Sequence, residues 1–198
     1  MSFRFEFWPT LAFIVVVLCW FAFVTVFLTG KKAMSAPESK RERTSIIGLV
    51  FQALSYGVVW AFHRQPFTSL TPSSKPLAIS IAVLTMILAI TSVWFFHAAM
   101  RTLGKQWSLA ARVLEGHKLV TEGPYSIVRN PIYTAMFGML LATGLAISHW
   151  LGLVVAIAMF VVGTAIRIRS EEKLLRNAFG AEFDAYAHRV PAIMPFMF

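Results

Sequence analysis

Residues 8–29 read WPTLAFIVVVLCWFAFVTVFLT and contain no charged side chain. An α-helix crosses the bilayer core, about 30 Å thick, with roughly 20 apolar residues, so these 22 residues predict one membrane span. The stretch is longer than the apolar part of a signal peptide, and Lys31 and Lys32 follow it closely. We therefore interpret it as an anchor rather than a cleaved signal.

Four further apolar segments follow along the chain. They are residues 45–62, 77–97, 131–147 and 150–166. Of the 198 residues, 58% are hydrophobic and 14% charged, and the mean hydropathy is +0.69. This composition excludes a disordered chain and disfavours a water-soluble one. We predict an all-α, polytopic integral membrane protein with five transmembrane helices.

The basic residues predict the orientation of these helices. Of the 18 lysines and arginines, 15 lie in three segments: between the first and second spans, between the third and fourth, and after the fifth. Five spans place all three segments on the same side, and cytoplasmic loops carry the excess of basic residues. We expect the N-terminus outside and the C-terminus in the cytoplasm. The net charge of +9 then needs no nucleic-acid partner.

Several kinds of site are excluded by the sequence. Cys19 is the only cysteine, so there is no disulfide framework, and no C-x-x-C motif for a metal or redox site. No metal site is expected. The chain also lacks G-x-G, which excludes the glycine-rich loops that hold dinucleotides.

Polar residues gather in the loop before the fourth span and in the tail after the fifth. The loop contains GHKLVTEGPY at residues 116–125 and RNPIY at residues 129–133. Asn is a favoured N-cap and Pro suits the first helical position, so Asn130 and Pro131 predict a helix start. Its free N–H groups are suited to a carboxylate. An ordinary capped helix with interfacial tyrosines is the alternative.

The tail begins with RIRSEE at residues 167–172. Glu172 and Arg176 are four residues apart in the order that favours an ion pair on a helix, whereas Arg167 and Glu171 are in the reverse order. We therefore expect Glu172 to pair with Arg176 on the surface. Glu171 is left without a structural explanation and is the better functional candidate.

Together these segments resemble the isoprenylcysteine carboxyl methyltransferase family and its integral-membrane relatives, which include phospholipid methyltransferases. The family pattern G-H-x-L-V-x-x-G-x-Y, then R-H-P-x-Y, then R-x-x-x-E-E and F-G after a helical hairpin is met in order over residues 116–183. Residues 1–98 match only as generic spans. The chain accordingly divides into three N-terminal transmembrane helices (1–98) and a methyltransferase core (99–198).

The resemblance implies S-adenosyl-L-methionine as methyl donor and S-adenosyl-L-homocysteine as product. It implies a cytoplasmic-face cofactor pocket formed by the loop before the fourth span and the C-terminal tail, with Arg167 orienting the substrate. The residues that it assigns to the cofactor are His117, Lys118, Leu119, Val120, Tyr125, Asn130, Pro131, Ile132, Tyr133 and Glu171. Two positions depart from the family: Asn130 stands where His is frequent, and Ala135 where Gly is frequent.

The acceptor implied by the resemblance is a lipid or lipid-modified molecule. A carboxylate of prenylcysteine or a similar isoprenoid-linked group is preferred, because it is nucleophilic without a base and an arginine can orient it. A phospholipid amine or a thiol stays open, although the sequence offers no convincing general base for either. An NADPH-dependent reductase of the sterol type is the alternative from another class. A transporter is disfavoured, because the spans contain no Asp, Glu, Lys or Arg.

Overall fold

The computed structural model describes residues 6–30, 38–41, 44–65, 67–71, 73–104, 112–114 and 118–193. Its helices are α1 (Phe7–Thr29), α2 (Ser45–Ala61), α3 (Lys75–Leu103), α4 (Pro131–Ile147), α5 (Trp150–Phe179) and α6 (Ala181–Arg189). The shorter elements are the strands β1 (Glu38–Arg41) and β2 (Arg112–Leu114) and the 3₁₀ helix η2 (Gly123–Ser126). Helices α1 to α5 therefore occupy the five apolar segments of the sequence, and α5 continues well beyond its apolar part.

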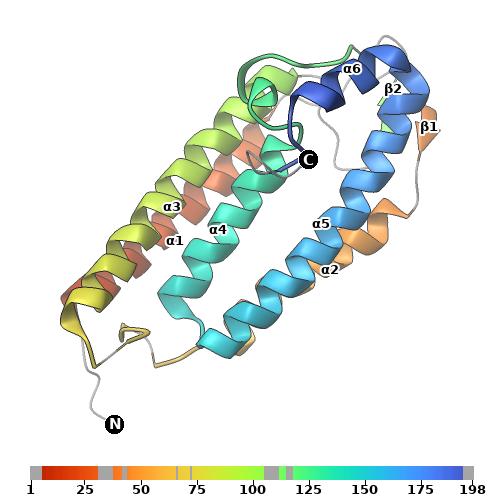
Figure 1. The fold of residues 1–198 in the computed structure, drawn as a ribbon. Coiled ribbons are helices and arrows are strands. Elements are labelled where there is room, and N and C mark those ends of the chain that lie inside the picture. Colours follow the sequence, from red (N-terminus) through yellow and green to blue (C-terminus); the bar gives the residue numbers. More distant parts are fainter. Residues whose placement is uncertain are drawn as a thin grey trace.

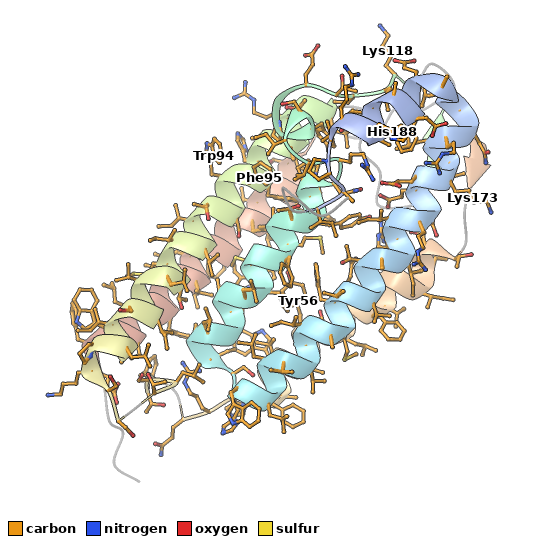
Figure 2. The ribbon with its side chains drawn as sticks, viewed as in Figure 1. Tyr56, Trp94, Phe95, Lys118, Lys173 and His188 are labelled. Atoms are coloured by element: carbon orange, nitrogen blue, oxygen red, sulfur yellow. The ribbon has the colours of Figure 1, made fainter. Side chains whose placement is uncertain are left out.

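The helices have the length and surface of a membrane protein. Helices α1, α3 and α5 are long and apolar enough to cross a bilayer. Helices α2 and α4 have 17 residues each, or about 26 Å at 1.5 Å per residue. Large apolar side chains cover the outer faces, such as Trp94 of α3, which points away from the bundle (Figure 2) and is 67% exposed. Water-soluble proteins rarely expose such continuous apolar surface, so this is an integral membrane protein.

The helices pack so that the two halves of the chain interleave (Figure 1). Helix α3 packs against α1 and α4, whereas α2 packs along α5, and α4 touches α1, α2 and α5. Phe23 of α1 stacks on Phe96 of α3 with ring centroids 3.9 Å apart. The indole N–H of Trp20 donates to Thr143 Oγ1 of α4 at 3.1 Å. Helix α4 therefore lies between the α1–α3 pair and the α2–α5 pair.

The contact between α2 and α5 is unusually close. A Cβ atom placed on Gly48 would lie 2.5 Å from the carbonyl oxygen of Gly163, and one placed on Gly163 would lie 2.7 Å from that of Gly48. Small residues allow helix backbones in membranes to approach in this way. The same interface buries one polar pair, in which Gln52 Nε2 donates to Thr164 Oγ1 at 2.8 Å.

The predicted cytoplasmic segments meet at one end of the bundle. Strand β1, which precedes α2, pairs antiparallel with β2, which lies between α3 and α4. Helices η2 and α6 lie at the same end (Figure 1), as do Lys118 and His188 (Figure 2). The helices form the expected all-α bundle, and this short two-stranded ribbon is an addition that the sequence did not predict. Strands of four and three residues are too short to show the alternating pattern by which a strand is recognised in a sequence.

At the opposite end, Arg64 binds the C-terminal end of α4. Its Nη2 donates to the carbonyl oxygens of Leu145 and Ala146 at 2.8 and 2.7 Å. Its Nη1 and Nε donate to the carbonyl oxygens of Ser148 and Thr68 at 2.6 and 2.9 Å. Burial lowers the pKa of Arg64 to about 10. These bonds satisfy carbonyl groups that a helix end leaves without partners, and they fasten the α2–α3 connection to α4.

Candidate functional site

Three polar side chains meet between α4 and α5, near the end that carries α6. The hydroxyl of Tyr133 donates to Glu171 Oε1 at 2.5 Å and accepts from Arg167 Nε at 2.6 Å. Arg167 Nη2 lies 3.2 Å from the same carboxylate oxygen, and the guanidinium carbon lies 5.4 Å from the centre of the Tyr133 ring. We call these three residues the Arg167 cluster. They form one connected network, in which each member fixes the others.

The cluster is closed on the arginine side and open on the glutamate side. Arg167 is 4% exposed, whereas the side chain of Glu171 is 26% exposed. Both contacts of Glu171 converge on Oε1, and none of the described residues donates a hydrogen bond to Oε2. The cluster therefore presents one carboxylate oxygen that can accept a hydrogen bond from a cationic ligand.

Two ion-pair expectations from the sequence are wrong. Glu171 is not without a structural partner, because it pairs with Arg167 despite the unfavourable order. Glu172 does not pair with Arg176: it accepts from Arg129 Nε at 2.9 Å, and Arg176 pairs with Asp184 of α6 at 2.7 Å. The spacing rule concerns an isolated helix. In the folded chain the partners come from other elements: Tyr133 of α4 for Glu171, Arg129 of the loop before α4 for Glu172, and Asp184 of α6 for Arg176.

Arg129 joins the loop before α4 to the end of the chain. Its Nε binds Glu172 of α5, and its Nη1 donates to the carbonyl oxygens of Ala187, at 2.8 Å, and Val190. Its backbone N–H donates to Pro191 O at 2.8 Å. One half-buried side chain thus holds α5, the end of α6 and the following segment together. Sequence reasoning missed this role, because the position of Arg129 before an N-cap gives no information about its partners.

Helix α4 begins at Pro131 as predicted, with Asn130 at the cap position. The side chain of Asn130, however, makes no capping bond. Its Nδ2 and its backbone N–H both donate to Ala192 O, at 3.1 and 3.0 Å, and Thr134 Oγ1 donates to Ile193 O at 2.9 Å. The expected cap is therefore wrong in its hydrogen bonding, because the asparagine binds the C-terminal segment instead.

A second group of predicted site residues packs against α6. The hydroxyl of Tyr186 donates to the carbonyl oxygen of Tyr125 at 2.6 Å, and Leu119 packs on the apolar cluster formed by Phe183, Tyr186 and Val190. Burial raises the pKa of the Tyr125 phenol, and that of Tyr186 to about 12. Both tyrosines are therefore neutral hydrogen-bonding groups at physiological pH.

The remaining predicted residues are distributed around these two groups. Lys118 is exposed, Val120 is half-buried, Pro131 is buried, and Ile132 packs against the main core. His117 lies outside the described residues. Among the residues that the structure describes, no three His, Cys, Asp or Glu side chains are grouped to hold a metal ion. The structure thus brings Tyr133, Arg167 and Glu171 into contact, and separately Leu119 and Tyr125 with α6.

Comparison with known proteins shows the family. Residues 80–182, just over half of the chain, match the phospholipid methyltransferase family. The chain belongs to this family. The match contains all three residues of the Arg167 cluster and ends inside α6. Helices α1 and α2 lie outside it.

Individual relatives match over similar lengths. The nickel-cobalt-cadmium resistance protein NccN of Alcaligenes xylosoxydans xylosoxydans is 38% identical over 111 residues, 54% of this chain and 50% of that protein. Protein-S-isoprenylcysteine O-methyltransferase B of Arabidopsis thaliana is 36% identical over 104 residues, 50% of this chain and 51% of that protein. The Saccharomyces cerevisiae protein-S-isoprenylcysteine O-methyltransferase is 33% identical over 135 residues, 65% and 56% respectively. The chain spans about half the length of the curated relatives it matches.

We expect Arg129→Ala to release α6 and the segment after it. The substitution removes three hydrogen bonds from a charged donor, each a substantial contribution where the donor is partly buried. Trypsin cleavage after Arg189 in the detergent-solubilised protein should become about tenfold faster, because proteolysis follows local opening. Arg176→Ala, which removes an exposed ion pair from α6, is the matched control and should change the rate little. Equal cleavage rates for Arg129→Ala and wild type would show that Arg129 does not hold this segment.

Proposed function

We propose that this chain is an integral-membrane methyltransferase that transfers a methyl group from S-adenosyl-L-methionine to a lipid or lipid-modified acceptor. The observation that carries the proposal is the Arg167 cluster, in which a buried arginine lies beside a partly exposed glutamate. The cluster falls within the segment that matches the phospholipid methyltransferase family. Two relatives, from Arabidopsis thaliana and Saccharomyces cerevisiae, are named O-methyltransferases of isoprenylcysteine.

The residues at this end of the bundle fit the methyl donor. Its amino-acid part carries an ammonium group, for which Glu171 Oε2 is an acceptor. Asn130 and Tyr133 lie close together at the start of α4, where Asn130 binds the C-terminal segment and Tyr133 binds Glu171. Its adenosine part needs an apolar surface, which Leu119 and Tyr125 form with α6. We assign the donor to these residues together with His117, Lys118, Val120, Pro131 and Ile132.

The chemistry asked of the protein is positioning and exclusion of water. The bound donor supplies a methyl group that is already activated by its sulfonium, so an acid–base triad is not required. We assign to Arg167 the orientation of an anionic acceptor, because a guanidinium can bind a carboxylate through two of its donors. Its Nε and Nη2 bind Tyr133 and Glu171 and the residue is 4% exposed, so an acceptor must exchange with one of these contacts to reach it. An isoprenoid carboxylate is therefore the acceptor that this site suits best.

We also propose that α1 to α5 are all membrane spans, with the N-terminus outside and the C-terminus in the cytoplasm. Two observations support this: β1, β2, η2 and α6 share one end of the bundle (Figure 1), and 15 of the 18 basic residues belong to the three sequence segments that contain these elements. In this arrangement residues 1–98 supply three spans and residues 99–198 the core that holds the donor. The donor then enters from the cytoplasm and the acceptor from the bilayer.

The orientation predicts which positions can be labelled from each side of a sealed cell. In a Cys19→Ala background, Ser39→Cys in β1 should react with a membrane-impermeant maleimide only after the membrane is opened. Ser73→Cys, in the exposed connection between α2 and α3, should react in intact cells. Labelling of Ser39→Cys in intact cells would overturn the proposed topology.

Isothermal titration calorimetry in detergent tests the cofactor assignment. We expect the wild-type protein to bind S-adenosyl-L-homocysteine, and Glu171→Gln to bind it at least about tenfold more weakly, because a charge-assisted hydrogen bond is lost. Glu182→Gln, which neutralises an exposed carboxylate of α6, is the matched control and should bind like wild type. NADPH should not protect the protein against thermal unfolding. Unchanged affinity in Glu171→Gln would remove Glu171 from the site.

Arg167→Lys separates binding of the acceptor from binding of the cofactor. The lysine keeps the positive charge beside Glu171 but loses the planar pair of donors, so the substitution is not conservative at such a site. In a labelled-methyl transfer assay with prenylcysteine, phospholipid-amine and thiol acceptors, kcat/KM for the carboxylate acceptor should fall about tenfold or more. Affinity for S-adenosyl-L-homocysteine should stay within about threefold. Arg169→Lys, on the exposed side of α5, is the control. Full activity of Arg167→Lys toward every acceptor would exclude Arg167 from acceptor binding.

A further inference from the structure

The aliphatic part of Arg167 lies directly against Gly48 of α2. A Cβ atom placed on Gly48 would lie 2.6 Å from Arg167 Cγ and 3.2 Å from the backbone nitrogen of the same arginine. Favourable carbon–carbon contacts are about 3.5–4.0 Å. The space that a side chain at position 48 would fill is therefore already occupied by the arginine and by the carbonyl oxygen of Gly163, which would lie 2.5 Å from the added Cβ atom.

This contact fixes the side of Arg167 that faces away from its hydrogen-bonding partners. The guanidinium is held on α4 and α5 through Tyr133 and Glu171, and the aliphatic part is confined by α2. Adding a Cβ atom at Gly48 would displace Cγ by roughly 1 Å to restore an ordinary contact. Hydrogen bonds weaken steeply with loss of geometry, so the guanidinium would no longer fit both partners.

We propose that Gly48 is a positioning residue, whose lack of a side chain places Arg167 in the site, and that α2 forms one wall of the site. The proposal rests on the proposed function only where it assigns Arg167 to the acceptor. Glycine in the interior of a helix costs about 1 kcal/mol relative to alanine, and Gly48 lies inside α2. The family match begins at residue 80, after α2, so the matched segment alone would not hold this arginine as the structure does.

Close packing of α2 on α5 is the competing role for Gly48. The structure offers two variants that separate the two roles. A Cβ atom on Gly163 would meet the backbone of α2 and Phe51 Cβ at 2.7–3.0 Å, and Arg167 is not among its three nearest neighbours. A Cβ atom on Gly57, also in α2, would meet nothing within 4 Å. Gly163→Ala therefore tests helix separation, and Gly57→Ala tests the substitution itself.

The decisive experiment is a double-mutant cycle between Gly48→Ala and Arg167→Ala. Methyl transfer to a prenylcysteine acceptor in lipid, binding of S-adenosyl-L-homocysteine and the unfolding temperature are each measured. We expect Gly48→Ala to raise the acceptor KM about tenfold in the wild-type background and at most about twofold when Arg167 is alanine, because residues in contact are coupled. Affinity for S-adenosyl-L-homocysteine should stay within about threefold. Gly57→Ala should behave like wild type, and Gly163→Ala should have the same effect in both backgrounds.

The proposal is overturned if Gly48→Ala leaves the acceptor KM unchanged, or if it changes the KM equally in both backgrounds. It is also overturned if Gly163→Ala is coupled to Arg167 in the same way. If Gly48→Ala does not fold, a folded double variant supports the proposal, because only the contact with the arginine side chain has been removed and the 2.5 Å approach to Gly163 O is unchanged. An unfolded double variant overturns it, since the backbone of α5 is then what excludes a side chain at position 48. If the wild type neither binds S-adenosyl-L-homocysteine nor transfers methyl groups, the proposed function fails. The cycle on unfolding temperature then still decides whether Gly48 and Arg167 are coupled.

Discussion

A guanidinium that leaves water must keep hydrogen-bonding partners, since an unpaired buried charge costs several kcal/mol. Arg167 meets this requirement between helices, through Tyr133 of α4 and Glu171 of its own helix. The requirement fixes the position of α4 relative to α5, because a shift of either helix would break the bonds to Tyr133. It also restricts α2, whose Gly48 leaves room for the arginine. Three helices thus depend on the placement of one side chain.

The elements that the sequence predicts well are those governed by local composition. The charge-free runs locate α1 to α5, and Asn130-Pro131 marks the first residue of α4 correctly. The ribbon of β1 and β2 is not predictable in this way, since its two strands are far apart in the chain and too short to show periodicity. The helix spacing rule similarly predicts an ion pair between Glu172 and Arg176, whereas in the folded chain Glu172 pairs with Arg129.

The site shows the same division. The types and spacings of its residues, through the family resemblance, select Tyr133, Arg167 and Glu171 as candidates, and the structure places them in contact. Their hydrogen bonding does not follow from the sequence, because Tyr133 is 34 residues from Arg167 and its hydroxyl contacts both partners. The contact of Gly48 with Arg167 is likewise invisible in the sequence. In an apolar helix, a glycine looks like any other small apolar residue.

An arginine at each end of α4 binds backbone carbonyl groups. Arg64 donates to the last carbonyl groups of α4 and to the segment after α2. Arg129, just before α4, donates to the end of α6. Irregular backbone near a bilayer has few water molecules to satisfy it, and a guanidinium with five N–H groups can serve several carbonyls at once. The loops that surround the site are thereby held by side chains rather than by regular secondary structure.

The pairing of α2 with α5 has a consequence for how the chain is made. Gln52 and its partner Thr164 are separated by 112 residues. At a synthesis rate of about 5–20 residues per second, α2 is therefore made on the order of ten seconds before α5. During that interval the amide of Gln52 and the bare backbone at Gly48 have no α5 to cover them. Until α5 is made, the face of α2 that will contact it therefore stays without its partner. The surface that encloses Arg167 thus cannot be completed before α5 is made.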